Sequence, residues 1–128
     1  MTILQQESNR KLVTDVMRKV FVERDVAHID RWFSPAYVQH NPAIPDGRDA
    51  IAKLVAALPA EFSYEMGMSI AEGDLVMVHG RYVGWESTPV IAVDIFRVEN
   101  GVLVEHWDVM QTEVPAGETR SGNAMFGR

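Results

Sequence analysis

The sequence contains no cysteine among its 128 residues. This absence excludes thiolate nucleophiles, disulfide bridges, iron–sulfur clusters and cysteine-ligated zinc. Basic side chains are also few, because twelve Lys and Arg residues stand against eighteen Asp and Glu residues, for a formal net charge of −6. Lys and Arg contacts to phosphate supply most non-specific affinity for nucleic acid, and no basic cluster reverses the balance locally, so we expect no nucleic-acid partner.

Long apolar runs are missing as well. No run approaches the roughly 20 residues of a membrane-spanning helix, and residues 1–7 lack the basic and apolar regions of a signal peptide. We therefore expect a cytoplasmic protein that does not contact membranes. What is present is a globular composition, with 47% hydrophobic and 23% charged residues, in a length that allows one domain spanning residues 1–128.

The first half of the chain predicts three helices. Apolar residues recur every three or four positions between residues 7 and 23, which is typical of an amphipathic helix. A short second helix is expected within residues 26–33, because the residue before Pro35 disfavours helical dihedral angles. Residues 37–47 hold two prolines and a glycine and predict an ordered loop. A third helix is expected at residues 51–58.

The second half predicts four antiparallel strands. β-Branched and aromatic residues alternate with polar ones in four segments, at residues 62–70, 75–85, 90–99 and 102–112. Turn-forming residues separate the segments, and connections this short cannot join parallel strands. Helices followed by such a meander predict an α+β fold, with the helices packed on one face of the sheet.

The last hairpin decides which ionisable side chains meet, and the sequence allows two registers. A three-residue loop with Gly101 in the left-handed conformation would pair Asp94 with His106 and Ala92 with Asp108. A two-residue Asn-Gly turn, the strongest short hairpin signal, would instead put Asp94 on the face opposite His106 and Asp108. We favour the three-residue loop because it gathers two carboxylates and an imidazole on one partly apolar face.

The favoured register assigns every side chain of the hairpin to a face, since side chains alternate along a strand. The face of Asp94 would also carry Phe96, Val98, Val102, Val104, His106, Asp108 and Met110. The other face would carry Val93, Ile95, Arg97, Leu103, Glu105, Trp107 and Val109. This second face is too apolar for water, so we expect another subunit to cover it.

The gathered groups favour proton-transfer chemistry. Two carboxylates about one strand spacing apart in an apolar cavity cannot both ionise cheaply, so one pKa should rise from about 3.9 toward neutrality. Such a carboxylate can remove a proton from carbon beside a carbonyl, while its partner or a histidine donates to the enolate oxygen. The candidate catalytic residues are therefore Asp108, Asp94 and His106.

Each candidate also has an ordinary structural interpretation. A strand aspartate near a turn is often a hydrogen-bonded surface residue, and His106 alone could be a half-buried histidine with satisfied hydrogen bonds. His40, in the predicted loop, could cap a backbone amide as readily as contact a ligand. The four histidines show no zinc-binding spacing such as H-E-x-x-H, so we expect no metal. Nucleophile-elbow, P-loop and dinucleotide-binding patterns are missing too.

Two segments carry a resemblance to a known family. The loop Tyr37-Val38-Gln39-His40-Asn41-Pro42 and the closing hairpin from Asp94 to Asp108 resemble the SnoaL-like polyketide cyclases of the nuclear transport factor 2 superfamily. The closest likeness is to the group predicted to catalyse aldol condensation, whose members also tend to end in a Met-Phe tail like Met125-Phe126.

The resemblance implies a cone-shaped fold, with three N-terminal helices on a curved antiparallel sheet of at least four strands around a deep pocket. It also implies dimerisation through the outer sheet face and chemistry without metal or organic cofactor. Asp108 matches the acid/base aspartate of the cyclases, and Asp94 matches an assisting group on the preceding strand. The cyclases have histidine where Asp94 stands, whereas ketosteroid isomerase has an oxyanion-hole carboxylic acid there.

We therefore expect a homodimeric enzyme that performs acid/base chemistry beside the carbonyl of a small molecule, as aldol condensation or cyclisation, isomerisation or dehydration. Asp108 would be the general acid/base, assisted by Asp94 and His106. The expected substrate contacts are His40, Tyr37, Phe96 and Met110. Two alternatives are a ligand-binding module that kept the pocket without the reaction, and a dimerisation scaffold whose cone is filled.

Overall fold

The structure is a computed structural model that describes residues 1–127. Its first helix, α1 (Ile3–Met17), begins four residues earlier than the periodicity predicts, because Thr2 forms a capping box with Gln5. The helix continues through a π-helical turn (Arg18–Val22). Its buried stripe packs on the sheet with the side chains of Val13, Val16, Met17 and Val20.

Arg24 reverses the chain after the π-helical turn, with a left-handed φ of 60°. Its guanidinium donates hydrogen bonds to the carbonyl oxygens of Val55, Leu58 and Pro59. Val55 lies in the last turn of α3 (Arg48–Ala57), and Leu58 and Pro59 follow the helix directly. The last carbonyls of a helix need donors from outside it. Arg24 thus ties the end of the first helical segment to the end of α3.

A strand occupies part of the segment where we expected a helix end and a loop. The short helix α2 (Ile29–Trp32) forms as predicted, but β1 (Phe33–Gln39) follows it directly. This strand pairs in parallel with β5 (Val102–Thr112) at the edge of the sheet. Parallel pairing across nearly 70 residues has no local turn signal, so nothing within the segment itself predicts that it joins the sheet.

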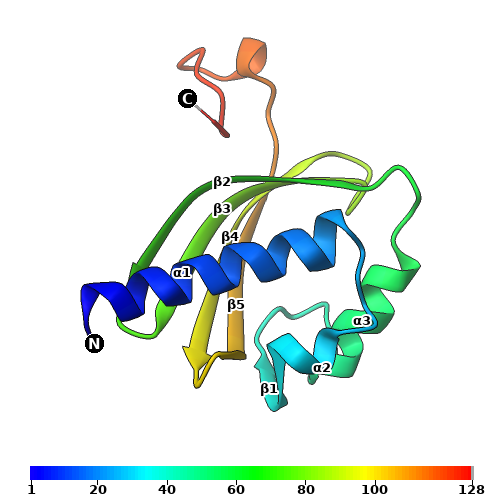
Figure 1. The fold of residues 1–128 in the computed structure, drawn as a ribbon. Coiled ribbons are helices and arrows are strands. Elements are labelled where there is room, and N and C mark those ends of the chain that lie inside the picture. Colours follow the sequence, from blue (N-terminus) through cyan, green and yellow to red (C-terminus); the bar gives the residue numbers. More distant parts are fainter. Residues whose placement is uncertain (128) are drawn as a thin grey trace.

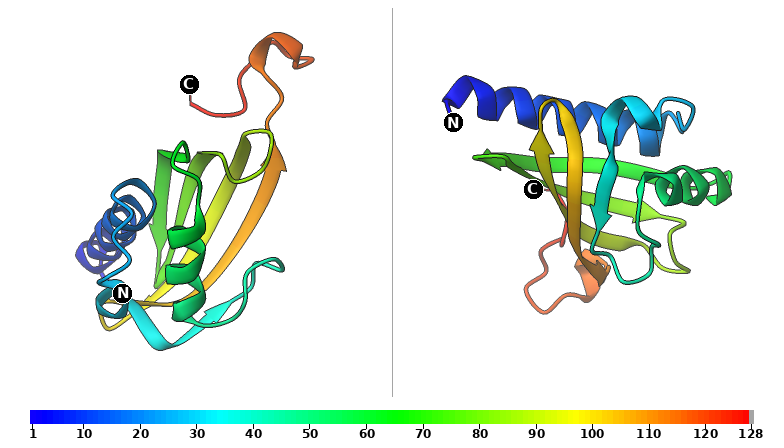
Figure 2. Two further views of the ribbon diagram at one scale, coloured as in Figure 1. Left: turned by 90° about the vertical axis from the view of Figure 1, so that its right-hand side faces the viewer. Right: turned by 90° about the horizontal axis from the view of Figure 1, so that it is seen from below.

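The four predicted antiparallel strands are all present. They are β2 (Ser63–Glu72), β3 (Leu75–Val83), β4 (Val90–Glu99) and β5, and the sheet order is β1-β5-β4-β3-β2. The sheet curves, α1 crosses one of its faces, and α2 and α3 lie beside β1 (Figure 1). We call the face that the helices cover the inner face. The C-terminal tail lies on the opposite, outer face (Figure 2).

The hairpin between β4 and β5 differs from the register that we favoured. Asn100 and Gly101 both have positive φ, of 51° and 78°, as a two-residue turn of the primed type requires. The three-residue loop is therefore wrong. So are its pairs, because Asp94 faces Asp108, Ala92 faces Met110, and His106 faces Phe96.

A β-bulge nevertheless brings the expected groups to the inner face. The register shifts between Arg97 and Val98, so that one extra residue, Val104, is accommodated in β5. Before the bulge, Leu103 pairs with Val98 and is fully buried, which corrects our assignment of Leu103 to the outer face and of Val102 to the inner one. After the bulge the even-numbered residues of β5 point inward.

An aromatic cluster covers the inner face of β2 and β3. The rings of Tyr64 and Tyr82 lie 4.7 Å apart, and Phe21 packs edge-on against Tyr82 at 5.9 Å. Gly80 makes room for this cluster, because a Cβ there would lie 2.6 Å from a Tyr64 ring carbon. Within residues 1–127, no helix is both long and apolar enough to cross a membrane.

Candidate active site

A small cavity lies between the inner face of the sheet, β1 and α3. Its volume is about 30 Å³, which is space for roughly two water molecules. The aromatic and aliphatic part of its lining includes Phe21, Phe33, Ile44, Ile51, Leu54 and Trp85. Of the expected site residues, Tyr37, Phe96, Met110, Asp94, His106 and Asp108 all line it. The residues brought together are thus the acid/base groups and three of the four expected contacts.

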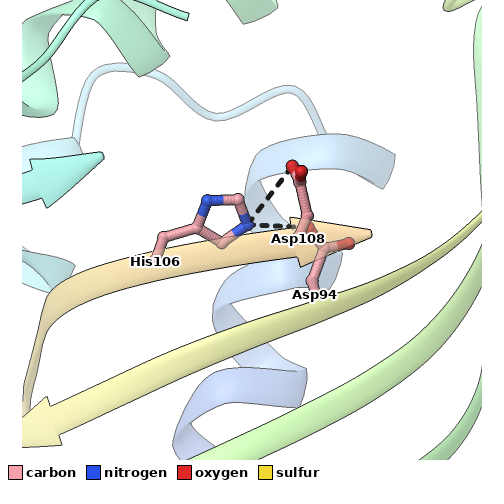
Figure 3. A group of neighbouring side chains, drawn as sticks. All are labelled: Asp94, His106 and Asp108. Atoms are coloured by element: carbon pink, nitrogen blue, oxygen red, sulfur yellow. Dashed lines mark hydrogen bonds and ion pairs between the residues drawn. The ribbon is translucent and has the colours of Figure 1, made fainter. Parts of the chain in front are cut away.

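Asp94 and His106 form a buried hydrogen-bonded pair (Figure 3). The distance between His106 Nε2 and Asp94 Oδ1 is 2.7 Å, and each side chain is only 6% exposed. The hydroxyl of Tyr82 donates to the other oxygen of Asp94 at 2.6 Å. Burial, and then the nearby Asp94 carboxyl, raise the pKa of Tyr82 well above its ordinary value, so Tyr82 remains a donor at neutral pH.

Asp108 lies beside this pair on the cavity wall, with its Oδ2 atom 3.9 Å from His106 Nε2. Asn41 Nδ2 donates to the same oxygen at 2.7 Å. Burial raises the pKa of Asp108 above its ordinary value, and the charge of Asp94 adds to this; the Asn41 hydrogen bond and His106 act in the opposite direction. A carboxylate with a raised pKa and few donors is a stronger base than an exposed one.

Gln39, Asn41 and Tyr82 are site residues that the sequence analysis missed. Gln39 Oε1 lies 2.6 Å from His106 Nδ1, and both Gln39 and Tyr82 line the cavity. Asn41 is buried and holds Asp108. Had the segment from Tyr37 been interpreted as a strand, its two-residue alternation would have placed Gln39 on the same side as Tyr37.

His40, which we expected to contact a substrate, does not line the cavity. Its ring stacks on Trp107 with centroids 4.9 Å apart, and its Nε2 atom lies 2.7 Å from Glu105 Oε2. Trp107 and Glu105 point to the outer side of β5. Because neighbouring residues of an extended segment point in opposite directions, His40 faces away when Gln39 faces the cavity.

The same three acid/base residues also offer possible metal ligands. One ligand atom from each of Asp94, His106 and Asp108 lies within 4.8 Å of the others. Ligand atoms about 2.0–2.1 Å from a tetrahedral zinc would be roughly 3.3 Å apart. Asp94 and His106 are closer than that, at the 2.7 Å of a hydrogen bond. The spacing of this pair is therefore that of a direct hydrogen bond.

The sequence pattern of the SnoaL-like domain matches residues 13–106, which is most of the chain. The chain belongs to the SnoaL-like domain family. The matched segment includes Asp94 and His106 and stops two residues before Asp108. No curated protein sequence matches this SnoaL-like chain.

Solved structures show the same fold. A candidate polyketide cyclase from Acidithiobacillus ferrooxidans is 19% identical, with a TM-score of 0.68 over 95% of this chain and 94% of that one. A candidate ketosteroid isomerase from Kribbella flavida is 13% identical, with a TM-score of 0.74 over 96% and 90%. An epoxide hydrolase from Mycobacterium tuberculosis is 14% identical, with a TM-score of 0.66 over 84% and 85%. Likenesses at such identities establish the α+β architecture of the SnoaL-like chain and leave its reaction open.

Proposed function

We propose that this SnoaL-like protein catalyses cofactor-independent proton transfer beside the carbonyl of a small molecule, with Asp108 as the general base. The observation that carries the proposal is a carboxyl of raised pKa on the wall of a small, largely apolar cavity, next to a buried Asp94–His106 hydrogen bond. A general base works best when its pKa lies near the operating pH. Proton donors near the developing oxyanion supply the other half of such a reaction.

The proposed step moves one proton at each end of the substrate. Asp108 takes a proton from the carbon beside the carbonyl. The electrons of that C–H bond form a carbon–carbon double bond, and the π electrons of the carbonyl group move to its oxygen. The proton shared by Asp94 and His106 passes to this oxygen, giving an enol. Return of the proton to a different carbon is isomerisation, attack of the enol on a second carbonyl is aldol condensation or cyclisation, and loss of a β-hydroxyl is dehydration.

The lining of the cavity favours an uncharged, compact substrate. Two carboxyl groups face the cavity, and none of the described residues that line it is Lys or Arg. An anionic substrate would therefore meet like charge without compensation. The volume of about 30 Å³ is far below the 300–1,000 Å³ of ordinary ligand sites. A substrate must displace the half-buried side chains of Ile44, Leu54, Trp85 and Met110 as it enters.

We further propose that two copies pair through the outer sheet face. Met68, Ile70 and Val109 are 53%, 64% and 68% exposed there. The chain's own tail covers a neighbouring part, where Phe126 packs on His79. The measurement is the molar mass by light scattering. Val109→Lys places a charge on this face and should give monomers. Leu4→Lys makes the same kind of change on α1 and should leave the dimer intact. A monomeric parent protein would contradict the pairing.

The reaction is tested by hydrogen–deuterium exchange at carbon. Small ketones incubated with the protein in D₂O should acquire deuterium beside the carbonyl, and Asp108→Asn should abolish this exchange while remaining folded. Asp49→Asn, at an exposed position on α3, is the matched control and should exchange at the parental rate. Binding of a ketone without exchange would support the ligand-binding alternative, and undiminished exchange in Asp108→Asn would remove Asp108 from the reaction.

A further inference from the structure

We infer that Gln39 is a positioning residue that keeps a proton on Nδ1 of His106, and thereby makes the proton on the Nε2 side the one that can leave. These protons have the same positions in the free protein, and only the catalytic consequence of their positions rests on the proposed function.

The orientation of the Gln39 amide follows from a backbone donor. The backbone N–H of Asn41 points at Gln39 Oε1 at 3.0 Å, and an N–H group requires an acceptor. The atom at that position is therefore the amide oxygen. The same oxygen lies 2.6 Å from His106 Nδ1. Since an amide oxygen has no hydrogen to give, Nδ1 must carry the proton of this short contact.

The fixed Nδ1 proton defines what the other ring nitrogen can do. Nε2 faces Asp94 Oδ1 at 2.7 Å, and a single proton on that line satisfies both atoms, whether it sits on nitrogen or oxygen. The second oxygen of Asp94 already accepts from the Tyr82 hydroxyl. The Asp94–His106 pair therefore holds one mobile proton, and this proton lies next to Asp108.

The Nδ1 proton determines the charge of the His106 ring after its Nε2 proton has been donated. When His106 keeps a proton on Nδ1, giving up the one on Nε2 leaves a neutral imidazole. An imidazole whose only proton sat on Nε2 would become an imidazolate on donating it, and burial of that anion beside two carboxyls would be costly. Gln39 thus determines how readily the pair can act as an acid.

Backbone pairing holds Gln39 in this place. Gln39 is the parallel partner of His106 across β1 and β5, and the backbone N–H of His40 donates to the carbonyl of His106 at 3.0 Å. The groups around the His106 ring are Asp94, Asp108, Gln39 and the ring of Phe96, whose centroid is 4.7 Å away. For metal-bound histidines, removing the partner that fixes the tautomer lowers metal affinity or activity by roughly 10- to 100-fold, and we expect an effect of similar size at His106.

The experiment is nitrogen NMR on protein labelled with ¹⁵N-histidine, with the His106 signals assigned by their loss in His106→Asn. In the parent protein, Nδ1 should be protonated at every pH at which the protein is folded. Gln39→Met should shift the neutral ring toward the Nε2–H tautomer. Gln39→Glu keeps an oxygen for both donors and should restore the Nδ1–H form.

Gln111→Met, on the outer side of β5, is the matched control and should leave the His106 signals unchanged. An Nε2–H tautomer in the parent protein would overturn the inference, and so would an unaltered His106 spectrum in a folded Gln39→Met. If Gln39→Met does not fold, the spectra of the parent protein and of Gln39→Glu still test the inference. Gln39→Glu must then show the parental tautomer, and a different tautomer would overturn the inference.

Ketone exchange provides the catalytic readout. Gln39→Met should lower kcat by about 10- to 100-fold with little change in KM, and Gln39→Glu should recover most of this loss. If the parent protein exchanges no ketone but its Nδ1 is protonated, the proposed function fails and the proton assignment stands. If the parent protein exchanges deuterium into ketones but shows an Nε2–H tautomer, the proposed function stands and the proton assignment fails.

Discussion

Two neighbouring tyrosines differ in a way that stability measurements can resolve. Both Tyr82 and Tyr64 are buried, at 4% and 7% exposure, and their rings are 4.7 Å apart. The Tyr82 hydroxyl donates to Asp94, whereas the Tyr64 hydroxyl has no hydrogen-bond partner within residues 1–127. Replacing each by Phe removes the same atom from nearly the same surroundings, so the two variants control for each other.

We expect Tyr82→Phe to lower the free energy of unfolding by about 1–3 kcal/mol, the range for leaving a buried acceptor without its donor. For a domain of this size the loss corresponds to a melting temperature lower by several degrees. Tyr64→Phe should leave the stability unchanged or raise it by up to about 1–3 kcal/mol, because it removes a buried hydroxyl that has lost its water without gaining a partner.

Urea unfolding at pH 7, followed by circular dichroism, measures both values. A double-mutant cycle with Asp94→Asn measures the coupling energy between the two side chains. Tyr82→Phe should cost less stability in the Asp94→Asn background, where the carboxylate is gone. The reasoning is refuted if Tyr82→Phe is as stable as Tyr64→Phe, or if its cost is the same with Asn at position 94.

Three further outcomes follow from the site and its surroundings. Burial raises the pKa of Asp108 in the folded protein. The protonated Asp108 carboxyl therefore contributes its full stabilisation below the unfolded pKa of about 3.9, and this stabilisation is lost as pH rises through the folded pKa. The free energy of unfolding of Asp108→Asn, relative to that of the parent protein, should therefore increase between pH 3 and pH 7. Urea titrations at each pH measure this difference. Gly80→Ala should cost about 1–3 kcal/mol by overpacking against Tyr64, while Gly117→Ala, with nothing within 4 Å, should not. Trp85→Ala should widen the cavity mouth and raise kcat/KM for bulky ketones relative to acetone in the exchange assay; an unchanged ratio would show that Trp85 does not limit entry.

The closing hairpin shows how far local reasoning reaches. Strand alternation correctly placed Asp94, Phe96, His106, Asp108 and Met110 on one face. It did so through the wrong turn, because the two-residue turn and the bulge at Val104 together shift the strand as a three-residue loop would. A bulge leaves no clear mark in a single sequence, since it is stabilised by how the strand packs.

The histidine loop shows where local reasoning fails. Two prolines and a glycine favoured a loop from Tyr37 onward, and His40 looked like the natural ligand contact. The strand β1 instead turns Gln39 inward and His40 outward, onto Trp107. Asn41 then reaches Asp108. The amides that hold the acid/base groups were invisible because their partners lie 67 residues away.

The amino-acid sequence by itself determined the helices, the four antiparallel strands and the chemical inventory of an acidic, cysteine-free chain. These are properties of periodicity, turn residues and composition, which act over a few positions. Tertiary structure alone decided that β1 joins the sheet in parallel, and that Gln39, Tyr82 and Asn41 surround the acid/base groups. Pairings between distant segments depend on how buried surfaces pack, and no pattern within either segment specifies its partner.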